Sequence, residues 1–136
     1  PISWQSSYRL PKGKRLLSFQ VRMKHSHPDG ARPPEIFAYA KEQLVHGQPL
    51  IRITKQGATN EEAWAVYHPR VAPQKAEICF TTDTGKWQDR NWQTLPASIE
   101  PLTRRVSAQI PANSRAFYLN LTGARGLIVS TEHIVR

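Results

Sequence analysis

The sequence predicts an all-β fold: an antiparallel β-sandwich of the immunoglobulin or fibronectin III type, with seven or eight strands. Three observations support this prediction. Apolar and polar residues alternate in several short runs, and turn residues separate these runs at intervals of roughly ten to twelve residues. Strand and helix patterns do not alternate along the chain, so a parallel sheet is disfavoured. The 136 residues, with 11 prolines and 7 glycines, suit one domain of many short elements.

The first part of the chain has the less regular pattern. Residues 17–23 alternate apolar and polar side chains, which predicts a half-buried strand. Residues 35–46 fit either a short helix or an extended segment, and residues 50–53 predict a short strand. We therefore expect a single domain, residues 1–136, in which a less regular part (1–60) precedes clean sandwich strands (61–136).

The second part contains the clearest strand patterns. Residues 63–67, 76–82 and 106–110 each alternate or run apolar between turn signals. Residues 117–121 and 127–131 are joined by a short link with two glycines, which predicts a β-hairpin. The side chains expected to be buried are Val106, Ile110, Phe117, Leu119, Leu121, Leu127 and Val129.

The charge balance is strongly basic, with 19 Lys and Arg against 10 Asp and Glu and a formal net charge of +9. The basic residues are spread over every segment, without a recognition helix, zinc finger or RNA-recognition signature. We therefore expect a solvated surface or one that faces an acidic neighbouring domain. A basic nucleic-acid-binding module is kept as an alternative. No apolar run approaches the ~20 residues of a membrane span, so we expect no membrane partner.

One run has the spacing of a metal site. His25, His27 and Asp29 follow the first predicted strand, and two imidazoles two residues apart on an extended chain can share one ion. The run resembles the His-x-His-x-Asp-His start of metallo-β-lactamases, but Gly30 stands where the last His belongs. A small metal-dependent hydrolase is therefore one alternative, and a solvated turn without a cofactor is the expectation.

The sequence contains no motif of catalysis. It has no Gly-x-Ser-x-Gly elbow, no Gly-rich phosphate loop, no His-Glu-x-x-His and no paired carboxylates. The single cysteine, Cys79, lies in a predicted strand without a neighbouring activator, which favours a buried small side chain over a nucleophile. We expect no catalysis by this chain alone.

A pair of tryptophans suggests a contact surface. Trp87 and Trp92 lie five residues apart, with Arg90 between them. Indoles that lie flat at the surface stack on sugar rings or on a partner, and we include Tyr118 in the same candidate set. The alternative is that a tryptophan fills the sandwich core, as in immunoglobulin-like domains. Trp64 is assigned to the core.

Four phrases carry a resemblance to a known family. They are AEICFTTDTGKWQDRNW (76–92), VSAQIP (106–111), AFYLNL (116–121) and RGLIVST (125–131). Together they resemble the immunoglobulin-like β-sandwich that follows the catalytic domain in some secreted bacterial α/β-hydrolases. These enzymes include acetyl-xylan esterases, dienelactone-hydrolase relatives and PhoPQ-activated proteins.

The resemblance implies a non-catalytic accessory or interaction domain in the periplasm or outside the cell. Such a domain packs on the catalytic domain of its parent chain or binds polysaccharide weakly. The catalytic triad would lie upstream, so no catalytic residue transfers to a position here. The start at Pro1, without Met, fits a domain taken from a longer hydrolase, and the sequence upstream of Pro1 in the gene would test this expectation.

Overall fold

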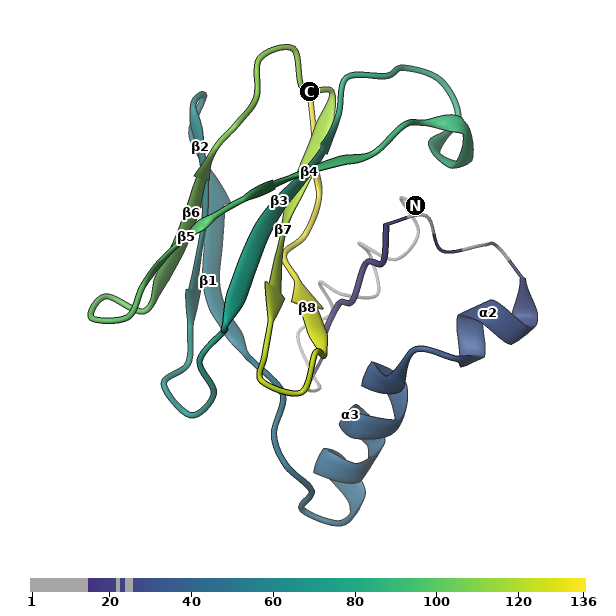
Figure 1. Cartoon of the computed structure of the whole chain (residues 1–136), viewed down its shortest axis with the longest axis vertical. Helices are drawn as coiled ribbons and strands as arrows, with labels where there is room; N and C mark the ends of the chain where they lie inside the picture. Colours follow the sequence, from purple (N-terminus) through teal and green to yellow (C-terminus); the bar gives the residue numbers. More distant parts are fainter. Residues whose placement is uncertain (1–14, 22, 24–25) are drawn as a thin grey trace.

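The computed structural model describes residues 15–21, 23 and 26–136 of the chain (Figure 1). Two antiparallel sheets face each other and form a β-sandwich, which confirms the predicted all-β class. The described part contains nine strands, where the sequence predicts seven or eight, because the chain between the third and sixth strands forms two short strands of its own.

The first sheet has the strand order β1-β2-β6-β5. Its strands are β1 (Ile53–Ala58), β2 (Glu62–Tyr67), β5 (Ser98–Glu100) and β6 (Arg105–Gln109). Strand β1 comes from the less regular part of the sequence, yet it pairs with β2 along its whole length, with one irregularity in register after Ile53. Both parts of the chain therefore contribute to this sheet.

The second sheet has the order β4-β3-β7-β8, and β9 pairs with the other end of β7. This order, beside the first sheet, corresponds to strands A-B-E-D and C′-C-F-G of immunoglobulin-type sandwiches. The strands of the second sheet are β3 (Lys75–Thr81), β4 (Gln93–Pro96), β7 (Ala116–Thr122), β8 (Ile128–Ser130) and β9 (Ile134–Val135).

The core between the sheets is close to the predicted one. Strands β7 and β8 form the predicted hairpin, and the amide of Gly123 donates to the carbonyl of Leu127 at 3.0 Å in the link. Ile110 packs against the core but is only partly buried, since it lies just beyond the end of β6 at Gln109. The other six predicted core residues are buried: Val106, Phe117, Leu119, Leu121, Leu127 and Val129.

The assignment of Trp64 to the core is wrong. Along β2 the inward positions hold Ala63, Ala65 and Tyr67, and Trp64 lies on the outer face of the sheet. There the guanidinium of Arg105 lies 5.1 Å from the indole centroid. The alternation of β2 is real, but its phase is set by packing across the sandwich, where small alanines suit the space between the sheets.

The predicted strand over residues 17–23 is also not found as such. In its described residues a single bridge joins Leu17 to Ser130 at the end of β8. Beyond it the backbone of Phe19 is bound by side chains rather than by a strand ladder. Met23, placed on the buried side of that strand by its alternation, is 47 % exposed.

Two helices of the described part of the chain lie at one end of the sandwich, on the side of β8 (Figure 1). They are α2 (His27–Ala31) and α3 (Pro34–Leu44), so the ambiguous segment 35–46 is mainly helical. Glu35 attaches α3 to the sandwich, because its carboxylate accepts a hydrogen bond of 2.9 Å from the amide of Ile128. Neither helix reaches the length and apolar character that would carry it across a membrane.

Candidate functional site

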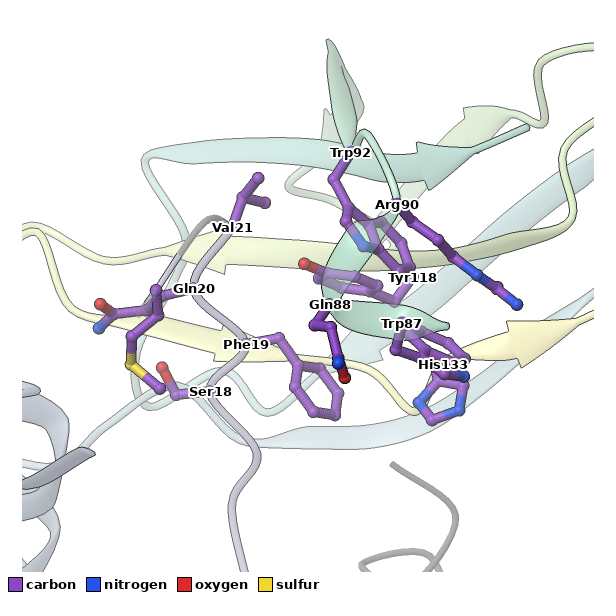
Figure 2. Close-up of a pocket in the computed structure, with 11 residues that line it drawn as sticks. Ser18, Phe19, Gln20, Val21, Trp87, Gln88, Arg90, Trp92, Tyr118 and His133 are labelled. Carbon is purple, nitrogen blue, oxygen red and sulfur yellow. The ribbon is translucent and has the colours of Figure 1, made fainter. Parts of the chain in front are cut away.

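A cleft of about 520 Å³ lies on the outer face of the second sheet (Figure 2). One wall is the segment Ser18–Val21 with Met23, and the other is the loop 87–92 between β3 and β4. All four residues that the sequence suggests as carbohydrate or partner contacts line this cleft: Trp87, Arg90, Trp92 and Tyr118.

The loop wall is a stacked aromatic cluster. Trp87 begins the short 3₁₀ turn η1 (Trp87–Asp89), and its ring stacks on Trp92 with centroids 5.4 Å apart and planes at 26°. The guanidinium carbon of Arg90 lies 4.7 Å from the Trp87 ring. Arg90 also donates from Nε and Nη2 to the carbonyl of Gly85, at 3.2 and 2.9 Å. Arg90 thus closes the loop and holds the indole in place.

Tyr118 forms the floor of the cleft. It points outward from β7, and its ring centroid lies 5.4 Å from Trp92 and 5.2 Å from Phe19. It lies opposite Cys79, its partner on β3. Burial raises the pKa of Cys79 to about 11 and raises the pKa of Tyr118 above its ordinary value. Cys79 is therefore a thiol at neutral pH and not a nucleophile.

Two further ring residues of the cleft were not selected from the sequence. Phe19 lies on the N-terminal segment, and His133 is buried between β8 and β9. The His133 ring lies 4.7 Å from Trp87 and 6.0 Å from Phe19, so it joins the two walls. The alternation of residues 17–23 marks Phe19 as apolar, but no local pattern marks His133, whose role comes from contacts with distant segments.

Neutral polar groups complete the lining. Gln88 is exposed, and its amide extends into the cleft beside Phe19 in Figure 2. The amide of Gln20 donates to Glu35 at 3.2 Å. The hydroxyl of Ser18 is buried and has no hydrogen-bond partner in the part of the chain that the structure describes. The cleft therefore combines aromatic rings with amide and hydroxyl groups.

The suggested metal ligands are only partly described. His25 lies outside the described residues, and His27 and Asp29 are in α2. The carboxylate of Asp29 accepts from the hydroxyl of Ser26 at 2.6 Å and pairs with Arg32 at 3.4 Å. Among the residues described, no group of three His, Cys, Asp or Glu side chains is placed to hold a metal ion.

Comparison with known proteins gives one similarity over most of the chain. A hybrid PKS-NRPS synthetase (phm1) from a Pyrenochaetopsis species is 27 % identical over 138 residues. The matched region is 87 % of this chain but 3 % of that protein, so the chain spans a very small share of its relative's length. No family model matches the chain. No solved structure matches it either.

Proposed function

We propose that this chain is a non-catalytic accessory domain of a secreted hydrolase, and that it binds polysaccharide weakly through the aromatic cleft. The observation that carries the proposal is the convergence of Trp87, Arg90, Trp92 and Tyr118 on one cleft. These residues come from two distant segments of the chain, and only the fold brings them together.

The chemistry of the cleft suits a sugar. A pyranose ring has an apolar face of C–H groups and an equatorial rim of hydroxyls, so it needs both an aromatic surface and hydrogen-bonding groups. Trp92 and Phe19 offer the first, and the exposed amide of Gln88 offers the second. A volume of about 520 Å³ is within the ~300–1,000 Å³ of small-ligand sites. Since both tryptophans are half-buried, the stacking area is limited and the binding is weak.

The accessory role has separate support. The sequence phrases of β3, β7 and β8 resemble the sandwich that follows the catalytic domain of secreted α/β-hydrolases. A weak sugar site in such a setting raises the local concentration of substrate for a neighbouring domain.

Affinity electrophoresis in gels that contain soluble xylan tests the sugar site. We expect the protein to be retarded, with a Kd of about 1 mM for xylo-oligosaccharides by calorimetry. Trp92→Ala should weaken binding about tenfold, because it removes an aromatic surface worth ~1.4 kcal/mol. Trp64→Ala is the matched control, since Trp64 lies on the outer face of the opposite sheet. Circular dichroism checks that both variants are folded.

The result that contradicts the sugar site is an absence of retardation in xylan, cellulose, mannan and pectin gels alike. Equal loss of retardation in the Trp92 and Trp64 variants would also contradict it, because binding would then not depend on the cleft.

A further inference from the structure

Helix α3 carries apolar side chains on its solvent side. Ile36, Phe37 and Leu44 are 48 %, 59 % and 80 % exposed, and Val45, directly after the helix, is 69 % exposed. Large apolar side chains of a short surface helix normally face the core. A group of them on the outer side therefore requires an explanation.

The helix geometry places these residues on one face. Ile36, Ala40 and Leu44 recur every four residues, with Phe37 beside them, so they form one stripe along α3. Ala40 is exposed as well. We call these four residues the α3 stripe. The two buried residues of the helix, Glu35 and Ala38, lie on the opposite face.

The inner face of α3 is held to the sandwich without the stripe. Glu35 accepts from the amide of Ile128 at 2.9 Å, and Glu42 accepts from the amide of Leu50 at 3.0 Å. Glu42 also pairs with Arg52 at 2.6 Å. Hydrogen bonds and an ion pair thus fix the inner face of the helix to the sandwich.

The free charge that α3 itself presents beside the stripe is positive. Both carboxylates of α3 are turned inward and engaged, as their hydrogen bonds show. Lys41 on α3 is exposed and follows Ala40 at the edge of the stripe. With a net charge of +9, two copies of the chain repel one another. A partner with acidic groups around an apolar centre is complementary to this surface, and a second copy is not.

The size of the stripe indicates how the partner is held. An 11-residue helix is about 16 Å long and roughly 10 Å wide. The surface area of one face of such a helix is far below the ~800 Å² that each partner buries in a stable complex of free proteins. A patch of this size is sufficient when a covalent linker keeps the partner at a millimolar effective concentration.

We propose that the α3 stripe docks on an apolar surface with an acidic rim, on an adjoining domain of the same polypeptide. The proposal rests on the accessory-domain part of the proposed function and is independent of sugar binding by the cleft. It assigns the stripe as the contact between this sandwich and its covalent neighbour.

Photo-crosslinking in the full-length natural polypeptide tests the proposal. Phe37 is replaced by p-benzoylphenylalanine, and mass spectrometry of a mixture of isotopically light and heavy protein identifies the cross-linked peptides. We expect cross-links to peptides of the same copy outside residues 1–136. Leu102, fully exposed in the turn between β5 and β6, is the matched control position and should give none. Cross-links between copies, no cross-link at position 37, or a gene product that ends at Arg136 would each overturn the proposal.

A second measurement separates a protein partner from a lipid surface. The protein is sedimented with vesicles of phosphatidylcholine and phosphatidylserine in equal parts. Because the net charge of +9 attracts anionic vesicles by itself, we expect the double variant Phe37→Ser, Leu44→Ser to co-sediment as much as the unmodified protein. Co-sedimentation that this double variant abolishes would replace the protein partner with a membrane. The same variant should be retarded in xylan gels like the unmodified protein. Failure of docking and failure of sugar binding are therefore read separately.

Discussion

The hydroxyl of Ser130 donates a hydrogen bond of 2.6 Å to the amide oxygen of Asn120, between the paired strands β7 and β8. The same hydroxyl accepts from the amide of Phe19 at 2.8 Å, and the Asn120 side chain donates to the carbonyl of Phe19 at 3.1 Å. Two buried side chains thus bind both backbone polar groups of Phe19. They attach one wall of the cleft to the sheet in place of a strand ladder.

Ser130→Ala should loosen that wall. The variant leaves the amide of Phe19 and the oxygen of Asn120 without their partner, which costs about 1–3 kcal/mol. Urea denaturation measures the loss, and hydrogen exchange at the Phe19 amide should become faster. Ser98→Ala, on exposed β5, should change the free energy of unfolding by less than ~0.5 kcal/mol. Unchanged exchange at Phe19 would show that other contacts hold the segment.

The sequence predicts well what local alternation determines. Phe117, Leu119 and Leu121 recur every second residue, and they face the core of β7 as expected. Alternation does not report what covers the other face of the strand. Tyr118 and Asn120 are buried as well, because the segment near Phe19, about a hundred residues earlier, lies over them. Contacts at such a separation leave no periodic pattern in the sequence.

For the candidate site, too, the sequence predicts the local part and not the contacts between distant segments. Trp87, Arg90 and Trp92 lie in one short stretch, so their proximity follows from the sequence. The stretch gives no sign that His133 joins them, because that contact depends on how β9 returns to β7. The phase of β2 was likewise not fixed locally, and for this reason Trp64 was assigned to the wrong face.

Phe117→Ala should be strongly destabilising. Phe117 is among the largest fully buried side chains, and its removal leaves a cavity between the sheets. We expect a loss of ~3–5 kcal/mol in the free energy of unfolding, measured by urea denaturation. Leu102→Ala removes a fully exposed side chain and should cost less than ~0.5 kcal/mol. A mild effect at Phe117 would mean that the core has another composition.

The buried thiol of Cys79 should make the folded protein less stable at alkaline pH. Burial raises the pKa of its thiol from 9.0 to about 11, so between these values the unfolded chain has lost a proton that the folded chain retains. The free energy of unfolding then decreases with rising pH, by at most ~1.4 kcal/mol per pH unit. Denaturation midpoints between pH 8 and pH 11 measure this effect.

Cys79→Ala is the control for this dependence. The variant should lose the decrease that begins near pH 9 and keep the one above pH 10, because the pKa of Tyr118 is also raised above its ordinary value of 10.0. In the unmodified protein the thiol should react with a disulfide reagent at neutral pH only as fast as the protein unfolds. Rapid labelling of the folded protein would contradict the burial of Cys79.

Glu42 should make the attachment of α3 sensitive to acid. Burial alone raises its pKa, but the hydrogen bonds from Arg52 and the amide of Leu50, with the charges of Arg52 and Arg70, outweigh burial and lower it below 4.5. A lowered pKa in the folded state means that the stabilisation is complete above pH 4.5 and is lost as the pH falls below it. Glu42→Gln should cost about 1–3 kcal/mol at pH 7 and weaken this acid dependence.

Glu61→Gln provides the comparison, because the Glu61 side chain is exposed. It should keep the pH dependence of the unmodified protein, measured by urea denaturation from pH 3 to pH 7. Hydrogen exchange of the α3 amides adds a local readout, since loss of the Glu42 contacts should accelerate exchange there and not in β7. Equal acid dependence of the Glu42 and Glu61 variants would mean that Glu35 and the buried Ala38 are sufficient to hold the helix on the sandwich.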